Sequence, residues 1–436
     1  MMGGAPAADS GRLRRSLLRG VMADRNFQRL WLSGLAFSFG DQFALLALSV
    51  TSVLVLHAST FQVGALGALG LSGYLVLGIP VGVWVDRWRK KPVLVGAEVV
   101  RAVSVLVIPV TYPTDELSMG MVFAAAASIG VAGVFFETAH TSVLPALVGR
   151  DAVSEGSARL RTIETTMRLV GPGLAGQVLR FTAGPVLYFV SAVAGAVSAL
   201  LIIGMRIDET KVAKTEREPF LSSLRQGAGF VLRHPVLRTF MSTSATINFG
   251  AGMFLAVLPL VVLRDLGIPP QTYGLIVSVG GVGGLVGSLL GLRIKNGLGE
   301  IRALQVMQCL FPFGLAGPAI ATMLPAAASL LIGLAEALFG FTIVVHNISA
   351  SGIRAKITPH RLMGRVSAAS RFVSLGALPV GSLLGGALGS WWSHATVMLV
   401  AGAIAAVAPL ILTLSPVGRF RTIPLMWLAD AASETV

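Results

Sequence analysis

The sequence predicts an all-α integral membrane protein with twelve transmembrane helices in two pseudo-symmetric six-helix bundles. The prediction rests on composition, on the spacing of apolar runs and on an internal repeat. Of the 436 residues, 54% are hydrophobic and only 12% are charged, whereas soluble domains carry roughly 25% charged residues. A spanning helix needs roughly 20 apolar residues. The chain therefore has room for about a dozen such helices and for no large soluble domain.

Apolar runs of spanning length are separated by glycine, proline and clusters of charge, which mark helix ends. They predict helices over 28–55, 61–85, 92–112, 118–142, 162–182, 184–206, 236–263, 272–294, 301–322, 326–350, 363–388 and 394–414. The expected domains are a cytoplasmic N-terminal tail, a first six-helix bundle, a cytoplasmic linker, a second six-helix bundle and a cytoplasmic C-terminal tail. Their respective ranges are 1–26, 27–206, 207–235, 236–414 and 415–436.

Basic residues gather in every second connection between the predicted helices. The even-numbered connections include Arg87, Lys91, Arg150, Lys211, Arg293 and Lys356, whereas the odd-numbered ones hold Arg264, with Arg180 at an adjoining helix end. Membrane proteins keep such residues on the cytoplasmic side. We therefore expect both termini in the cytoplasm and a bacterial-type inner (plasma) membrane. The net charge of +14 records this orientation, and no nucleic-acid partner is expected.

The linker begins polar and then becomes amphipathic, with Phe220, Leu224 and Val231 spaced for one face of a helix. This spacing predicts a short helix on the membrane surface. A partner-binding role for this helix is the alternative.

The two predicted halves repeat one plan at a nearly constant offset. The matched pairs are Arg29 and Arg238 (238 − 29 = 209), Gly64 and Gly274 (274 − 64 = 210), Gly78 and Gly287 (287 − 78 = 209), and Gly82 and Gly291 (291 − 82 = 209). Duplicated helical bundles hold their binding site near the bilayer midplane, between the repeats. The repeat therefore predicts a central site exposed to one side of the membrane at a time.

The second predicted helix closes with Gly78-Ile-Pro-Val-Gly82-Val-Trp-Val-Asp86-Arg87-Trp-Arg89-Lys90-Lys91. This stretch resembles the cytoplasmic loop signature of the major facilitator superfamily, with Arg89 where the family usually has glycine. The resemblance implies a gating motif. In it Gly82 allows close helix approach, Asp86 faces a helix N-terminus, and Arg87, Arg89 and Lys90 pair with acids across the halves. An ordinary basic loop with an incidental acid is the alternative.

The fifth predicted helix contains Arg168-Leu-Val-Gly171-Pro172-Gly173-Leu-Ala-Gly176. It resembles the Gly-Pro motif of the superfamily's exporters and antiporters, in which proline kinks the helix and glycines allow tight packing. The alternative is that these are the glycines and prolines that are common in transmembrane helices, without a special role. Arg25–Trp31 and Leu362–Val366 resemble the branch with macrolide-efflux and siderophore-export proteins, and the likeness covers about residues 24–415. It implies a monomeric secondary transporter that exports an amphipathic compound in exchange for a coupling ion, of which H⁺ is the better candidate and Na⁺ the alternative.

Charge inside hydrocarbon costs roughly 2.5–3.5 kcal/mol per residue on insertion scales, so ionisable residues within the spans are candidate site residues. Asp41 stands 12 residues after Arg29 (41 − 29 = 12), about 18 Å into the membrane. It is the first candidate for a proton-carrying carboxylate. Glu164 and Arg168 are spaced to pair on one helix face. Arg371 lies at a similar depth in the eleventh predicted helix. Static pairing within the bundle is the alternative for each.

The second half offers further candidates. Glu336 is its deepest acid, and Glu137 and His346 occupy equivalent positions of the repeat (346 − 137 = 209), with Asn347 beside the histidine. Histidine titrates near neutral pH and so could share a proton pathway. A hydrogen-bonded packing role is the alternative.

No catalytic or nucleotide-binding signature is present in the sequence. We therefore expect no enzymatic activity, no cofactor and no metal site. An importer of the same fold and a non-transporting membrane sensor or scaffold are the alternative functions.

Overall fold

The computed structural model describes residues 20–149, 151–206, 228–359, 362–424 and 427, and these residues form helices without any strand. The first half contains α2 (Arg25–Val50), α3 (Thr60–Arg87), α4 (Lys90–Thr111), α5 (Met119–Val148), α6 (Val153–Val178) and α7 (Val186–Ile203). The second half contains α9 (Pro235–Leu260), α10 (Pro270–Leu298), α11 (Glu300–Ala321), α12 (Ala328–Ile357), α13 (Met363–Leu388), α14 (His394–Ala405) and α15 (Val407–Leu414).

Each predicted span corresponds to a helix, with two differences. The last span is divided at Ala406 into α14 and α15, because Pro409 removes a backbone donor and its ring clashes with the carbonyl four residues earlier. Within the described residues, eleven helices are long and apolar enough to cross a membrane, and α6 is the one remaining long helix. It carries Glu155, Arg159, Arg161, Glu164 and Arg168. The polar residues of α6 therefore have to face protein or water rather than lipid.

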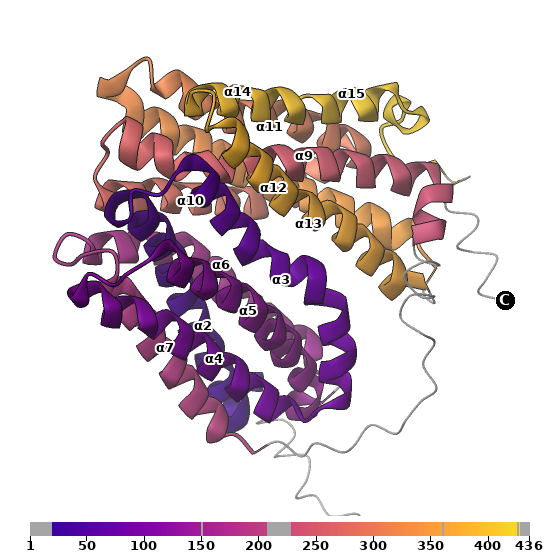
Figure 1. Cartoon of the computed structure of the whole chain (residues 1–436). Helices are drawn as coiled ribbons and strands as arrows, with labels where there is room; N and C mark the ends of the chain where they lie inside the picture. The colour runs from indigo at the N-terminus through magenta and orange to yellow at the C-terminus, as the bar shows by residue number, and fades with distance from the viewer. Residues whose placement is uncertain (1–19, 150, 207–227, 360–361, 425–426, 428–436) are drawn as a thin grey trace, which may run out of the picture.

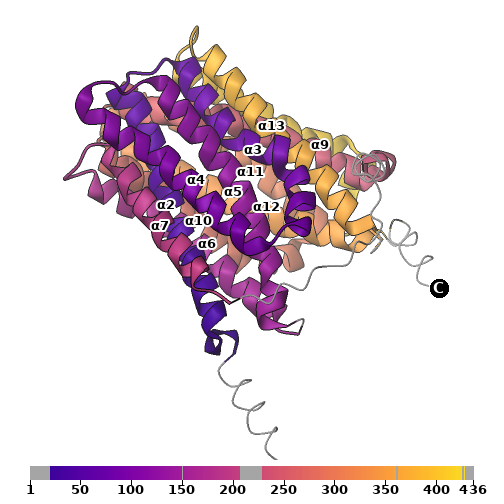
Figure 2. The same cartoon turned by 60° about the horizontal axis from the view of Figure 1, so that its bottom comes forward.

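The halves pack as two bundles that meet mainly at two helix crossings, with a smaller contact between α3 and α9. In the first half, α2 contacts α5, α6 and α7, while α4 contacts α5 and α7; in the second, α9 contacts α13 and α14, while α12 contacts α10 and α11. Between the halves, α3 lies beside α13 and α6 lies beside α10, as Figures 1 and 2 show. The two crossings are equivalent, because α3 and α10 are the second helices of their halves and α6 and α13 the fifth. The predicted fold class is confirmed.

The duplication extends to an irregularity of the backbone. α2 continues as a π-helix over Thr51–Val55, and α9 does so over Val261–Asp265. The two π-helices are 210 residues apart at both ends (261 − 51 = 210; 265 − 55 = 210). Single π turns in α-helices are rare, and those that occur often lie at functional positions. Their recurrence shows that the repeat preserves local geometry as well as helix order.

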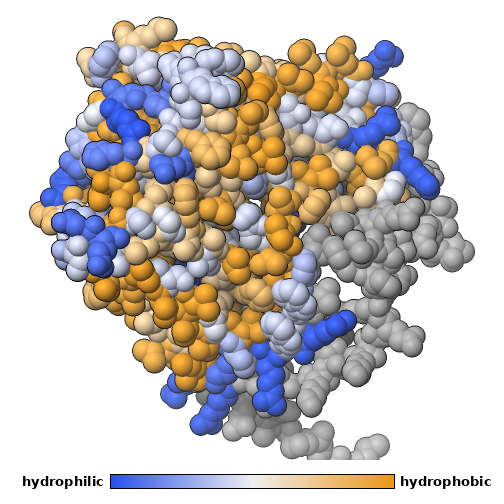
Figure 3. Space-filling model, viewed as in Figure 1, coloured by the Kyte–Doolittle hydropathy of each residue, from blue (hydrophilic) through white to orange (hydrophobic). Residues whose placement is uncertain are grey.

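The surface of the molecule is apolar around its middle. Figure 3 shows orange side chains over the helices and blue side chains gathered at the edges. Large apolar side chains stay exposed on the outward faces, such as Val76 (65%), Leu289 (68%) and Leu334 (58%). An aliphatic surface of this extent is stable in lipid rather than in water. The structure is that of a multi-pass membrane protein.

We name the two ends of the bundle by their residues. The basic end holds Arg87, Lys90, Arg293 and Lys356, and the opposite end, called the His394 end, holds Thr60, Asp265 and His394. Of the predicted linker helix, residues 228–233 are helical and Val231 is buried, whereas Phe220 and Leu224 lie outside the described residues.

Candidate functional site

The halves are in close contact near the His394 end. A Cβ at Gly64 of α3 would stand 2.5 Å from the carbonyl oxygen of Ser382 and 2.7 Å from the Cα of Gly386 on α13. At the equivalent crossing, a Cβ at Gly274 of α10 would stand 2.8 Å from the Cα of Gly176 on α6. All three distances are too short for a side chain. The two backbones are therefore held against each other at both crossings, at positions that the repeat relates (274 − 64 = 210; 386 − 176 = 210).

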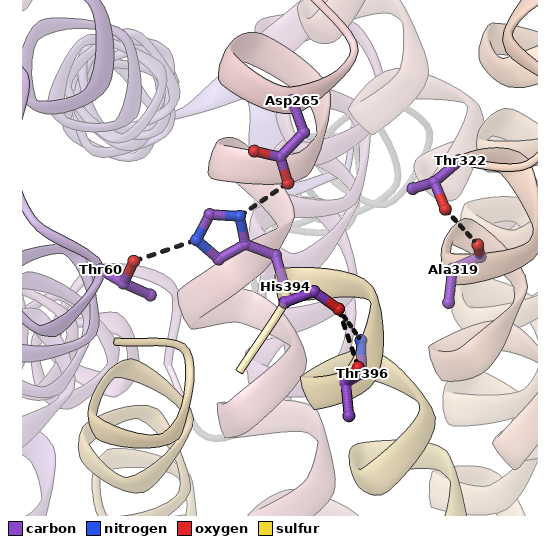
Figure 4. Close-up of polar contacts among 7 residues, drawn as sticks. Thr60, Asp265, Ala319, Thr322, His394 and Thr396 are labelled. Carbon is purple, nitrogen blue, oxygen red and sulfur yellow. Dashed lines mark hydrogen bonds and ion pairs between the residues drawn. The ribbon is translucent and has the colours of Figure 1, made fainter. Parts of the chain in front are cut away.

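Polar contacts tie the same end together. The Nε2 atom of His394 lies 3.0 Å from the Thr60 hydroxyl of the first half, and its Nδ1 lies 2.6 Å from Asp265 Oδ2 (Figure 4). Because an ionised carboxylate only accepts, Nδ1–H donates to Asp265, and a neutral ring accepts from Thr60 at Nε2. Arg264 Nη2 also donates hydrogen bonds to the carbonyl oxygens of Val53 (3.3 Å) and Ala58 (2.9 Å) in the first half. We call Thr60, Arg264, Asp265 and His394 the His394 latch.

The contacts between the halves do not continue to the basic end of α3. Leu75 still reaches Gly376 of α13, with 2.7 Å between its Cδ1 and a Cβ built on that glycine. Among the described atoms, none lies within 4 Å of a Cβ built on Gly78 or Gly82. The close approach expected at Gly82 is therefore not seen in this arrangement, because the face of α3 that carries Gly78 and Gly82 has no close neighbour among the described atoms. The other face stays packed on α5, with Val81 and Val85 buried and Trp84 stacked on Phe135.

The remaining residues of the expected gating motif surround the turn between α3 and α4. Arg87 is the last residue of α3, Arg89 is the N-cap of α4 and Lys90 its first residue; both arginines are exposed. The side chain of Asp86 lies outside the described part of the structure. The neighbouring Lys91 donates to the carbonyl oxygens of Ile203 (2.7 Å) and Met205 (2.8 Å), which ties α4 to the end of α7 within the same half.

The expected Gly-Pro motif lies at a helix junction. Gly171, Pro172 and Gly176 are buried on α6. A Cβ at Gly171 would stand 2.6 Å from the Cβ of Gln42 on α2, while Gly176 faces α10. The backbone N–H of Gly173 donates to Ser278 Oγ of α10 at 2.8 Å. The motif therefore joins α6 both to its own bundle and to the other one.

Four of the predicted residues come together in the first half. Asp41 of α2 is half-buried, and its charged neighbours include Arg168 and Glu164 of α6. Glu137 of α5 interacts electrostatically with Asp41, and its carboxyl is in contact with the Tyr74 hydroxyl of α3. Arg168 donates to Glu164 at 3.0 Å, and these side chains stay 68% and 55% exposed. These residues converge from α2, α3, α5 and α6, and we call them, with the pair described next, the acidic cluster.

Two further members of the cluster were not predicted. Glu98 and Arg101 of α4 are each 1% exposed and form a salt bridge of 2.8 Å between Oε2 and Nη2. Arg101 also neighbours Asp41. The signal in the sequence is a Glu-x-x-Arg spacing inside an otherwise apolar span, which places both side chains on one helix face. Hydropathy alone conceals it, because two charges barely lower the average over the span.

The candidates of the second half do not form a matching cluster. Glu336 is buried between α12 and α10, with its Oε2 3.0 Å from a Cβ built on Gly280, and its Oε1 has no hydrogen-bond partner among the described residues. His346 is buried, with Nε2 3.5 Å from Ser244 Oγ of α9. Ten residues of helix separate the two, about 15 Å. Asn347 and Arg371 are exposed, the latter on α13.

Comparison with known proteins gives one family. The family model described as "Major Facilitator Superfamily" matches residues 30–377. The chain is 22% identical to "Macrolide efflux protein A" of Enterococcus faecalis over 321 residues, 73% of this chain and 98% of that protein. It is 24% identical to "Multidrug efflux pump Tap" of Mycolicibacterium fortuitum over 379 residues, 82% of this chain and 89% of that protein. A solved bacterial homologue of the iron transporter ferroportin, in an inward-facing state, superposes with a TM-score of 0.70 at 17% identity, covering 89% and 98% of the two chains.

Proposed function

Because the chain belongs to the Major Facilitator Superfamily, we propose that it is a proton-coupled exporter of a small amphipathic molecule in a bacterial-type plasma membrane. The observation that carries the proposal is the acidic cluster. It holds four carboxyls (Asp41, Glu98, Glu137 and Glu164) and two guanidiniums (Arg101 and Arg168) within membrane-spanning helices. Such groups are costly in a bilayer and mark proton or substrate pathways.

The direction of export rests on two relatives. Both proteins are named for efflux and match over most of this chain. The positive-inside rule places the basic end in the cytoplasm. In that orientation the His394 latch and the glycine contacts close the outer side, while the Glu164–Arg168 pair is exposed. We infer that the structure is the inward-open state, in which an exporter takes up its substrate.

Coupling then requires substrate and proton to prefer different states. A ligand that binds two conformations equally shifts nothing. We propose that Asp41 binds a proton after the substrate has left on the outer side and releases it on the inner side. Arg168 and Glu164, which are exposed, and Arg371 on α13, the partner of α3, are placed to contact substrate. Glu137, held by Tyr74, is a further proton acceptor beside Asp41.

The test is erythromycin accumulation in a bacterial host that lacks its own efflux pumps. Cells that express the chain are expected to accumulate less erythromycin than vector controls, and an uncoupler should abolish the difference. Ethidium serves as a second, cationic probe. Greater accumulation in cells that express the chain, reduced by the uncoupler to the level of the vector controls, would favour import. If the chain is present in the membranes of the expressing cells, and these cells accumulate as much of both probes as the vector controls, the proposal is contradicted.

A further inference from the structure

The Glu98–Arg101 pair is fully enclosed. Arg101 donates to Glu98 Oε2 from Nη2 at 2.8 Å and from Nε at 3.1 Å, and from Nη1 to the Phe37 carbonyl oxygen at 3.5 Å. Its guanidinium carbon also lies 4.6 Å from the centre of the Phe37 ring. The other oxygen, Glu98 Oε1, is buried without a hydrogen-bond partner among the described residues, because the neighbouring Ser198 hydroxyl donates to the Ser33 carbonyl oxygen at 3.1 Å. A static ion pair normally satisfies both carboxylate oxygens, because an unpaired buried one is costly.

Two glycines make room for this pair. A Cβ at Gly40 of α2 would stand 3.4 Å from Arg101 Nη2 and 3.1 Å from the Ser191 carbonyl oxygen of α7. A Cβ at Gly195 of α7 would stand 3.2 Å from Glu98 Oε2. Gly40 directly precedes Asp41. The guanidinium of Arg101 is therefore packed against the turn of α2 that carries Asp41.

The charges in this region do not balance. The groups that act on Asp41 are Arg101 from α4, Arg168 and Glu164 from α6, Tyr74 from α3, Glu137 from α5 and Glu98 from α4. Arg168 is already paired with Glu164, and Glu137 is in contact with Tyr74. Arg101 is the one cation of the described structure that neighbours both Asp41 and Glu98. While Glu164 holds Arg168, a single guanidinium cannot neutralise both carboxylates, so one of them has to hold a proton.

We propose that Glu98 is a second proton-binding residue, which shares one proton with Asp41 and exchanges it as Arg101 pairs with one carboxylate or the other. When the O–H bond of Asp41 breaks and that of Glu98 forms, the proton moves inward and Arg101 becomes the counter-ion of Asp41. The reverse transfer restores the pair seen here. No other reactant is needed. The half-buried Asp41 connects the site to water, whereas the enclosed Glu98 stores the proton. This inference rests on the proposed proton coupling.

The test follows the neutral carboxyl groups by infrared spectroscopy of the purified protein. Biosynthetic labelling with glutamate carrying a ¹³C side-chain carboxyl shifts the carbonyl band of protonated glutamate away from that of aspartate. Glu98→Gln is expected to remove part of the shifted band. Arg101→Gln should enlarge the neutral-carboxyl signal, because Glu98 then lacks a cation and Asp41 keeps only Arg168, which is paired with Glu164; Arg101→Lys should leave it close to wild type. Glu155→Gln, which breaks the exposed Glu155–Arg159 pair on α6, is the matched control and should change nothing.

An unchanged glutamate band in folded Glu98→Gln would overturn the proposal, since Glu98 would then be a permanently ionised partner of Arg101. Size-exclusion profiles check folding, and Arg101→Lys keeps the test valid if Arg101→Gln is unstable. In cells, Glu98→Gln should also lose uncoupler-sensitive erythromycin efflux; full retention of that efflux would contradict a proton-carrying role. The spectroscopic result needs no substrate. If wild-type protein does not export erythromycin, the proposed function fails while the infrared bands still decide the role of Glu98.

Discussion

Asp41 and Glu336 are both acids deep within spanning helices, but their surroundings differ. Asp41 has two arginines nearby, from α4 and α6, and is half-buried. Glu336 is buried within the second half, faces Gly280 and lacks a basic neighbour among the described residues. A coupling residue has to reach water in at least one state and has to gain a counter-ion when it loses its proton. The partial exposure of Asp41 and its neighbouring arginines fit these requirements, and the surroundings of Glu336 do not.

Asp41→Asn should therefore abolish uncoupler-sensitive efflux of erythromycin while the protein stays folded. Asparagine has the shape of the protonated acid and cannot release a proton, so the variant should still exchange erythromycin across vesicle membranes with substrate on both sides. Asp115→Asn is the control, because Asp115 is an exposed helix cap whose φ of 57° asparagine adopts readily. Normal pH-driven efflux in Asp41→Asn would remove Asp41 from the mechanism.

Glu336→Gln should give the opposite result. The substitution removes a buried carboxyl that has an unpaired oxygen, and such groups cost roughly 1–3 kcal/mol. We expect efflux to stay within about twofold of wild type and thermal stability in detergent to be unchanged or higher. Loss of efflux with intact folding would instead make Glu336 a proton carrier.

The site residues could be predicted only in part, for a physical reason. An acid such as Asp41 stands out because it interrupts an apolar run, whereas Glu98 and Arg101 compensate each other's charge one helix turn apart. His394 and Asp265 could not be recognised as partners, because 129 residues separate them and their contact depends on how the bundles close. Which candidates converge is a property of helix packing. Asp41, Glu137, Glu164 and Arg168 are brought together, and Glu336 and His346 are not.

At the scale of helices, hydropathy located every span, but it misplaced the start of α6. The predicted helix begins at 162, whereas α6 begins at Val153. The added turns are polar, and the exposed Glu155–Arg159 pair, at 3.1 Å, supports them by an i, i+4 contact that hydropathy does not register. The repeat predicted more than helix order, since Gly64 and Gly274 both lie at contacts between the halves.

The contact at Gly64 provides a test of opening. Gly64→Ala places a methyl group against the backbone of α13 in the other half, and overpacking costs about 1–3 kcal/mol. Separation of the halves relieves this clash, so we expect the population open at the His394 end to increase by roughly tenfold without loss of thermal stability. Ser382 of α13 is 1% exposed and donates to the Gly64 carbonyl oxygen at this contact, so labelling of Ser382→Cys in a Cys309→Ser background would measure the increase.

Gly385→Ala is the matched control for that prediction. Its methyl group would stand 2.7 Å from the Cα of Met253 on α9, within the same half. Opening cannot relieve a clash inside one bundle, so this variant should lose thermal stability and show no faster labelling at Ser382→Cys. Equal effects of the two substitutions would contradict a movable contact at Gly64.

For the whole molecule, closure depends on few polar contacts, because the His394 latch joins the halves at one end. Thr60→Val should weaken the closed state more than Asp265→Asn, because the Thr60–His394 hydrogen bond crosses between the halves, whereas Asp265 and His394 both belong to the second half. A neutral hydrogen bond contributes about 1 kcal/mol, and Asp265→Asn acts on closure only through the orientation of the His394 ring. Thr60→Val should therefore label faster at Ser382→Cys than wild type, and Asp265→Asn should increase the rate less. Unchanged rates in both would show that the glycine contacts alone hold this end shut.

The orientation of the molecule can be decided in intact cells. The basic end carries exposed Arg87 and Arg89, and such residues resist translocation across the membrane. We expect a membrane-impermeant maleimide to label Ser59→Cys in intact cells and Arg89→Cys only after permeabilisation, each in the Cys309→Ser background. Exposed polar positions at both ends make the two sites comparable in reactivity. Labelling of Arg89→Cys in intact cells would show the opposite orientation. The state described here would then be open to the exterior, as an importer requires for substrate uptake.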